Sequence, residues 1–155
     1  MEITISRQSM NHLYTMGQLR INGQHQTFTV EDTQSMLPAG RYIVRIVKRS
    51  ARRQTICIFS SEGDSHAPLS AITVCHSWIG CRKYRQQRNH PSLSPVSIGT
   101  PLIPGAMYKS IPVYERITDR LMKCIVRKEL ITLSVSERNC IQNRPISHWL
   151  TPVTH

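Results

Sequence analysis

Short segments in which apolar and polar residues alternate run through most of the sequence and constrain the fold more than any other feature. Alternation with a period of two predicts half-buried β-strands, because successive side chains of a strand point to opposite faces of the sheet. The segments begin about ten residues apart, which is typical of an all-β sandwich or barrel. Such strands are predicted at residues 2–7, 17–22, 26–31, 41–48, 55–59, 72–76, 96–98 and 130–135.

Two turns support this pattern. Asn22-Gly23 separates two alternating segments, and both residue types tolerate the positive φ of a two-residue turn, so residues 17–31 are predicted to form a β-hairpin. A second turn is predicted at residues 37–40, Leu-Pro-Ala-Gly, because proline fixes φ and glycine supplies a permissive backbone.

One segment has the periodicity of a helix instead. Ser110 is expected to begin it, with Pro112 in the first turn, where a missing N–H costs nothing. Apolar residues recur on one face (Val113, Ile117, Leu121, Cys124 and Ile125) and charged residues on the other (Glu115, Arg116, Asp119, Arg120 and Lys123). The sequence therefore predicts a mainly β fold, sandwich or barrel-like, with one amphipathic helix in its C-terminal half.

The length of 155 residues suits a single domain. We expect this β-rich domain to cover residues 1–137, followed by an extended tail over residues 138–155. No apolar run approaches the roughly 18–20 residues that a membrane helix needs, so no membrane span is predicted. Residues 1–10 lack the apolar segment of a signal peptide, which predicts synthesis in the cytoplasm. Later delivery to the cell envelope stays open, and the sequence does not indicate an oligomeric state.

The chain is strongly basic, with 20 Lys and Arg against 9 Asp and Glu and a net charge of +11. Such a charge attracts polyanions, including nucleic acid, anionic glycans and acidic peptides. The alternative is a basic protein without a polyanionic partner, because net charge bears on association and not on fold.

Five cysteines make an odd number and include no C-x-x-C pair, so reduced thiols are expected in place of a disulfide framework. Cys75, His76, Cys81 and His90 offer ligand types that suit zinc. Adjacent strand residues point to opposite faces, however, so Cys75 and His76 do not converge easily. We predict neither a metal site nor a cofactor.

Residues 71–98 contain the strongest candidate for chemistry. An apolar strand ends at His76, a cationic loop follows, and the turn Ser94-Pro95 precedes the next strand. The loop cations Arg82, Arg85 and Arg88, together with Ser94, are predicted to bind carboxylate or phosphate groups of a ligand. A strand-borne histidine, a polar excursion and a turn into a second strand also make up a plausible layout for Cys/His acyl transfer.

Several motifs occur in an order that resembles a small bacterial and phage domain family of unassigned function. The family is related in pattern to the L,D-transpeptidase (YkuD-type) catalytic domain, and the resemblance covers roughly residues 3–137. The motifs are Gly17-x-Leu19 with Ile21, Thr-Val-Glu-Asp at 29–32, Pro-Ala-Gly-Arg-Tyr at 38–42, the strand ending in His76, Val-Ser-Ile-Gly at 96–99, Ser110 and Ile-Thr-Leu at 131–133.

The resemblance implies a β-rich fold and, in intact members, a cysteine nucleophile with a histidine base acting on cell-wall peptides. His76 matches that histidine, Ser94 matches the glycine before the nucleophile, and Pro95 stands where the cysteine belongs. Proline has neither a nucleophile nor a backbone N–H to stabilise an oxyanion. The standard chemistry is therefore expected to be impaired or absent.

Other groups could substitute. Cys81 has Arg82 and Lys83 beside it, and neighbouring cations favour a reactive thiolate. Ser92 or Ser94 could be activated by His76 in the manner of Ser–His pairs. The alternatives are an unreactive loop thiol, turn serines and a structural histidine. If catalysis survives, His76 is the predicted base and Cys81 the predicted nucleophile.

Two hypotheses follow. The first is a divergent, catalytically impaired transpeptidase-like domain that binds an anionic peptide or peptidoglycan fragment. The second is a non-enzymatic basic module that binds nucleic acid or an acidic protein. Glu31-Asp32, a conceivable pair of catalytic carboxylates, is interpreted as a solvated strand end, because neighbouring side chains of a strand diverge.

Overall fold

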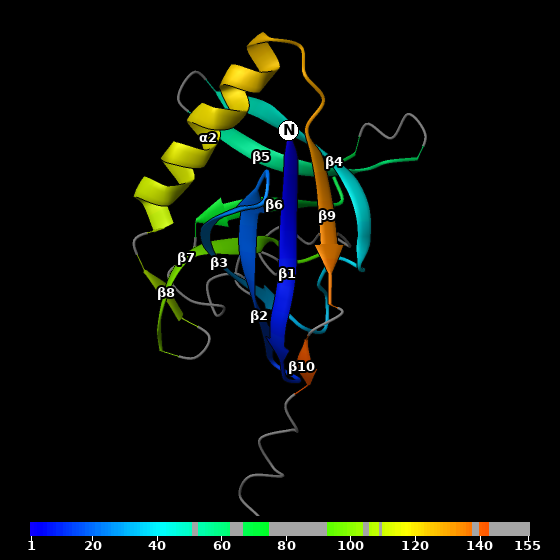
Figure 1. Ribbon diagram of the computed structural model, residues 1–155, viewed down its shortest axis with the longest axis vertical. Coiled ribbons are helices and arrows are strands. Elements are labelled where there is room, and N and C mark those ends of the chain that lie inside the picture. Colours follow the sequence, from blue (N-terminus) through cyan, green and yellow to red (C-terminus); the bar gives the residue numbers. More distant parts are fainter. Residues whose placement is uncertain are drawn as a thin grey trace, which may run out of the picture.

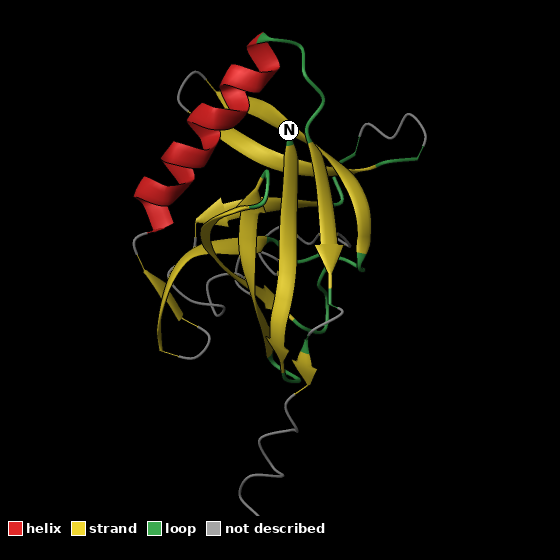
Figure 2. Ribbon diagram, viewed as in Figure 1, coloured by secondary structure: helices red, strands yellow, loops and turns green. Residues whose placement is uncertain are grey.

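The computed structural model describes residues 1–50, 53–62, 67–74, 93–103, 106–108, 110–137 and 140–142. Its main body is a closed barrel with a helix lying across one end (Figure 1; Figure 2). The elements, in chain order, are β1 (Glu2–Met10), β2 (Tyr14–Ile21), β3 (Gln24–Asp32), β4 (Gly40–Ser50), β5 (Arg53–Ser60), β6 (Ser70–Val74), β7 (Val96–Ile103), β8 (Ala106–Tyr108), α2 (Ser110–Val126), β9 (Thr132–Ser136) and β10 (Ile141–Gln142).

Pairing around the barrel follows the order β1-β2-β3-β7-β6-β5-β4-β9, and a parallel β9–β1 pair closes the ring of eight strands. Two pairs within the ring are parallel, β1–β9 and β6–β7, and the others are antiparallel. The mainly β fold with one helix is thus confirmed. The sequence left a sandwich and a barrel open, and the structure is a barrel.

The β2–β3 hairpin turns as its sequence predicts. Asn22 has a φ of 49° and Gly23 a φ of 84°. Positive φ at both central residues is the geometry of a type I′ turn, whose twist matches that of the flanking strands. Asn22 also binds the start of β1, because its side-chain oxygen accepts a hydrogen bond from the Glu2 amide at 3.0 Å.

Alternation decides which side chains fill the barrel. The inward positions of neighbouring strands are in register, as in the pairs Ile3–Ile21, Ile5–Leu19 and Ile3–Leu133. These side chains pack into one continuous apolar cluster, so the barrel interior is a core and not a channel. Its fully buried aliphatic residues include Ile3, Ile5, Leu19, Ile21, Leu37, Ile56, Ile58, Ile72, Val96, Ile98 and Leu133.

The helix α2 closes one end of the barrel. Ile117, Leu121 and Cys124 are buried against the core, which confirms the predicted apolar face at these positions. Ile125 is 38% exposed, so its predicted burial is wrong. One residue advances a helix by about 100°, and with Cys124 pointing inward Ile125 is turned towards the flank. No helix among the described residues is long and apolar enough to cross a membrane.

The opposite end of the barrel is closed by the segment between β3 and β4, residues 33–39. Leu37 is completely buried and belongs to the core cluster. The Tyr42 hydroxyl donates to the Pro38 carbonyl oxygen at 2.5 Å, which fixes the turn that precedes β4. Nearby, β10 pairs in parallel with the end of β1 at Ser9 and Met10.

We predict that Gly17→Ala destabilises the fold by about 1–3 kcal/mol, because it overfills a packed site. A Cβ at this position would lie 2.7 Å from the Ser6 carbonyl oxygen and 2.8 Å from Thr29 Oγ1. Urea unfolding measures the change. The control is Gly23→Asn, at an exposed turn where an added Cβ meets nothing within 4 Å, so that any loss there reflects its φ of 84° and not packing. Equal stabilities for Gly17→Ala and the parent protein would contradict this account of the packing.

Candidate functional site

A buried ion pair lies inside the barrel at the end opposite α2. Arg7, the inward residue of β1 at a bulge, is 2% exposed, and Glu31 of β3 is 1% exposed. The Arg7 guanidinium donates through Nε to Glu31 Oε2 at 2.9 Å and through Nη2 to Glu31 Oε1 at 2.8 Å. This two-point geometry is the strongest that an arginine and a carboxylate can form.

The same guanidinium reaches two further segments. Arg7 Nη2 donates to the Leu37 carbonyl oxygen at 2.5 Å, and Nη1 lies 3.4 Å from Glu137 Oε2 just after β9. Burial lowers the pKa of Arg7, but the hydrogen bonds and charges of Glu31 and Glu137 outweigh it and raise that pKa above its ordinary value. Arg7 therefore stays charged and joins β1, β3, the 33–39 segment and the end of β9.

This arrangement corrects the interpretation of Glu31-Asp32 as a solvated strand end. Both residues are buried, Asp32 with 5% exposure. Glu31 points into the barrel opposite Thr15 and pairs with Arg7, whereas Asp32 Oδ1 accepts the Gln34 amide at 3.2 Å. The signal was present in the sequence, because Ile3-x-Ile5-x-Arg7 and Thr27-x-Thr29-x-Glu31 continue the inward alternation.

The turn before β7 is buried as well. Ser94 is 1% exposed, and its amide and its hydroxyl both donate to the Ser35 carbonyl oxygen, at 2.8 and 3.3 Å. Ser70 Oγ donates to the Ser94 carbonyl oxygen at 2.8 Å, and Pro95 is also buried. The hydroxyl that was predicted to bind a ligand is thus held by the main chain inside the protein.

The pairing of β6 with β7 bears on the predicted acyl-transfer layout. The two strands are parallel, with Ile72 opposite Val96 and Val74 opposite Ile98. Ser94 therefore lies beside Ser70 at the start of β6, about 13 Å along the sheet from Val74 at the end of that strand. His76, Cys81, Arg82, Arg85 and Arg88 lie outside the described residues, and their predicted convergence stays a prediction.

Among the described cysteines, none forms a disulfide. Cys57 and Cys124 are buried and Cys140 is partly exposed. Burial, followed by the influence of Glu129, raises the pKa of the Cys124 thiol, and burial, followed by the charge of Glu137, raises that of Cys140. In the part of the chain that the structure covers, no group of three or more His, Cys, Asp or Glu side chains could hold a metal ion.

A row of cations follows one flank of α2. Arg116, Arg120, Lys123 and Arg127 recur at intervals of four, three and four residues, so they share one side of the helix. The Arg127 amide still donates to the Lys123 carbonyl oxygen at 3.3 Å, which extends the helical turn. The four positions span about 17 Å along the helix axis.

The helix itself packs on β6 and β7, and the first residue of this row, Arg116, also contacts the β2–β3 hairpin. Arg116 Nη2 donates to the Gln26 carbonyl oxygen at 3.1 Å. Next to Gln26, His25 and Phe28 form an edge-to-face aromatic pair with ring centroids 4.9 Å apart. Arg20 is the strand partner of His25 and donates to Gln18 Oε1 at 2.9 Å. We call Arg20, His25, Phe28, Arg116, Arg120, Lys123 and Arg127 the arginine–aromatic surface.

Exposure suits this surface to a ligand. His25, Arg116, Lys123 and Arg127 are exposed, and Arg20, Phe28 and Arg120 are half-buried. Half-burial holds the Phe28 ring and the Arg20 guanidinium in place while leaving part of each accessible. Periodicity predicted the cations of α2, but no local pattern indicated that Arg116 reaches the hairpin.

Comparisons with known proteins give no relative: no family model, no curated protein and no solved structure matches this chain. The resemblance to transpeptidase-like domains is therefore without support from these comparisons.

We predict that Arg7→Met destabilises the fold by about 3–5 kcal/mol, because it leaves the Glu31 charge buried and unpaired. The double variant Arg7→Met/Glu31→Leu should recover most of that loss, since an apolar pair of similar volume needs no desolvation. Urea unfolding of both single variants and the double variant measures the coupling.

The matched control for this cycle is Arg127→Met. It removes the ion pair of Arg127 with Glu129, whose atoms lie 3.6 Å apart and whose side chains are 66% and 43% exposed. An exposed pair contributes about 0–1 kcal/mol. If Arg7→Met cost no more than this control, the buried pair would not be the stabilising contact described above.

Thiol labelling tests the cysteine environments. Iodoacetamide reacts with thiolates, so a raised pKa means less reactive species at a given pH. In native protein at pH 7.5, we expect Cys57 and Cys124 to stay unlabelled and Cys140 to react more slowly than free cysteine, accelerating only at higher pH. Peptide mass spectrometry measures each rate. Selective, rapid labelling of Cys81 would instead support the acyl-transfer hypothesis.

Proposed function

We propose that this protein is a non-enzymatic module that binds single-stranded nucleic acid through the arginine–aromatic surface. The observation that carries the proposal is the contact between Arg116 and the Gln26 carbonyl oxygen, which joins the cationic row of α2 to the aromatic pair of the hairpin. Cations that track a phosphate backbone beside an aromatic platform for bases are the usual means of binding single strands.

The electrostatics favour a polyanion. Net charge of +11 draws anions to the whole molecule, and the arginine–aromatic surface concentrates five of its cations on neighbouring elements. Guanidinium groups bind phosphate oxygens through two parallel hydrogen bonds. Asp119 lies three residues after Arg116 and four before Lys123 and so shares this flank, and Arg127 pairs with Glu129, but these two carboxylates still leave the five cations in excess.

The aromatic pair of His25 and Phe28 favours nucleic acid over an acidic protein as the partner. Every base has a flat face that stacks on an aromatic ring, whereas Asp and Glu side chains have none. His25 is exposed and Phe28 is half-buried, so the base would contact the imidazole and one part of the phenyl ring. These features favour nucleic acid over an acidic protein partner.

The transpeptidase-like alternative depends on residues that the described structure does not contain. Outside the described residues lie its predicted base His76, its predicted nucleophile Cys81 and the ligand-binding arginines Arg82, Arg85 and Arg88. Of the two described residues of that turn, Ser94 supplies a buried hydroxyl bonded to a main-chain oxygen and Pro95 supplies no nucleophile. No contact among the described residues favours this alternative over the nucleic-acid module.

Fluorescence anisotropy with a fluorescein-labelled 15-nucleotide poly-dT strand tests the proposal across a series of NaCl concentrations. Five phosphate contacts predict a slope of about −3.5 for the logarithm of the association constant against the logarithm of salt concentration. Arg116→Gln/Arg120→Gln should make the slope less steep by about 1.4, because two contacts are lost. Phe28→Leu should weaken binding roughly tenfold without changing the slope, because it removes stacking and no charge.

The control is Arg41→Gln/Arg45→Gln, which removes the same charge from the outer face of β4 and should leave both quantities nearly unchanged. Equal losses of affinity in the two double variants would show that binding depends on net charge alone and would contradict the proposed surface. Poly-glutamate that competes with the DNA strand at equal charge concentration would instead identify an acidic protein as the natural class of partner.

A further inference from the structure

Large apolar side chains are exposed where α2 ends and the chain turns towards β9. Ile125 is 38% exposed, Val126 77% and Leu130 64%, and these are three of the six exposed large apolar residues in the described part of the chain. Figure 1 shows this segment at the upper extreme of the molecule, beyond the ends of the strands. We call Ile125, Val126 and Leu130 the apolar tip. Exposed apolar groups that gather in one place mark an interaction site more often than scattered ones do.

The residues of the apolar tip are close to one another. Ile125 and Leu130 line the same depression of about 440 Å³, together with Ile43 and Ile46 of β4. Val126 is about 200° around the helix from Cys124, which is buried, so its side chain points away from the barrel. Apolar surface therefore extends from this depression to the end of the helix.

The turn that ends α2 holds the tip in a fixed shape. The Glu129 amide donates to the Cys124 carbonyl oxygen at 3.0 Å, and the Lys128 amide donates to the Ile125 carbonyl oxygen at 2.9 Å. This pair of hydrogen bonds is the Schellman motif, in which the residue at the position of Lys128 is usually glycine. Lys128 has a φ of 58°, which is unfavourable for a residue with a Cβ. A cation thus stands beside the apolar tip at a position where glycine would be more stable.

Positive charge surrounds the tip. Residues 120–131 contain four Lys and Arg and a single acidic residue, Glu129, whose carboxylate is paired with Arg127 at 3.6 Å. Arg45 and Lys128, both exposed, line the depression that Ile125 and Leu130 share. A partner that covers the tip therefore needs an apolar part and negative charge next to it.

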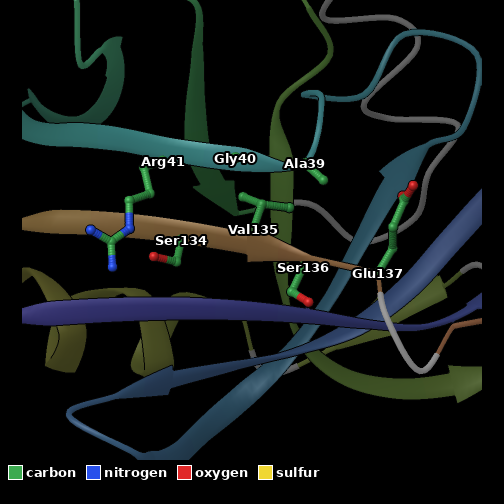
Figure 3. Close-up of a pocket in the computed structure, with 7 residues that line it drawn as sticks. All are labelled: Ala39, Gly40, Arg41, Ser134, Val135, Ser136 and Glu137. Carbon is green, nitrogen blue, oxygen red and sulfur yellow. The ribbon is translucent and has the colours of Figure 1, made fainter.

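Another depression of the outer surface has a different character. It lies where β4 meets β9, and Figure 3 shows Arg41, Ser134, Ser136 and Glu137 among its lining residues. None of the residues that line it is an exposed large apolar residue. Exposed apolar and cationic groups are thus combined at the apolar tip and not at this depression.

We propose that the apolar tip docks on the surface of a membrane that contains anionic lipids. Ile125, Val126 and Leu130 would enter the boundary between head groups and acyl chains, and Arg127 and Lys128 would bind lipid phosphates. An anionic bilayer has an apolar layer directly beneath a layer of negative charge, which complements the tip and its surrounding cations. A second copy of this chain fits less well, because two facing tips would bring like charges together.

Sedimentation with sucrose-loaded vesicles tests the proposal. We expect the protein to bind vesicles made of equal parts of phosphatidylcholine and phosphatidylglycerol, and to bind phosphatidylcholine alone far more weakly. Val126→Ser/Leu130→Ser should weaken binding to the anionic vesicles at least tenfold, because it removes apolar contact and leaves the net charge at +11. Lys128→Gly should weaken it about fivefold, since it removes one cation near the lipid surface. The same variant should not lower the midpoint of thermal unfolding, because glycine relieves the positive φ.

The matched control is Ile111→Ser/Ile141→Ser, at side chains that are 52% and 67% exposed and lie outside the apolar tip. It should bind vesicles as the parent protein does. Equal vesicle binding by the parent protein and by Val126→Ser/Leu130→Ser would overturn the proposal, and so would an equal loss in the control. A dimer that this tip variant abolishes, in a parent protein that does not bind vesicles, would identify a second copy as the occupant and also overturn it.

Membrane docking is separable from the proposed nucleic-acid binding. Val126 and Leu130 do not belong to the arginine–aromatic surface, so Val126→Ser/Leu130→Ser should bind poly-dT as tightly as the parent protein. Failure of one proposal therefore leaves the other standing.

Discussion

The buried pair of Arg7 and Glu31 sets how the elements at one end of the barrel are arranged. Two charges that are almost fully removed from water are tolerable only if their hydrogen bonds are satisfied, and here Nε and Nη2 meet both carboxylate oxygens. Two of the three remaining N–H donors of the guanidinium bind the Leu37 carbonyl oxygen and Glu137. One side chain thus fixes the relative positions of β1, β3, the 33–39 segment and the end of β9. An apolar residue of the same volume would pack against these elements but would not fix their orientation.

Closure of the two barrel ends by different means leaves the outer surface as the place for ligands. At one end α2 supplies Ile117, Leu121 and Cys124, and at the other Leu37 packs beneath the ion pair. With the interior filled by aliphatic side chains, the described barrel offers no internal ligand cavity comparable to those of larger barrels. Chemistry-bearing side chains at outward positions of the strands, and on the flank of α2, are therefore the groups available to a partner.

Local alternation was enough to predict the eight strands of the barrel, the Asn22-Gly23 hairpin and the helix, because each of these depends on neighbouring residues in the sequence, whereas the short β8 and β10 were not predicted. It was not enough to predict closure, since β9 reaches β1 across most of the chain, as in the pairing of Ile3 with Leu133. Nor did it predict the buried charges. Arg7 and Glu31 occupy inward positions, but a charged residue at the end of a strand has the same pattern whether it continues into the core or leaves it for solvent. Only the presence of the partner on another strand distinguishes the two cases.

The same guanidinium connects the interior with the surface. Glu137 contributes one oxygen to Arg7 and keeps 46% of its side chain exposed, so part of the network that closes the barrel end is open to solvent. A solvent ion that competed for Glu137 would leave Glu31 in place, because its two oxygens hold Arg7 from the inside. The principal ion pair of the barrel end is thus protected from solvent. The arginine–aromatic surface has no such connection to Arg7, since it is held to the hairpin by the contact of Arg116 with a main-chain oxygen. Binding at the arginine–aromatic surface is therefore not expected to disturb the Arg7 network.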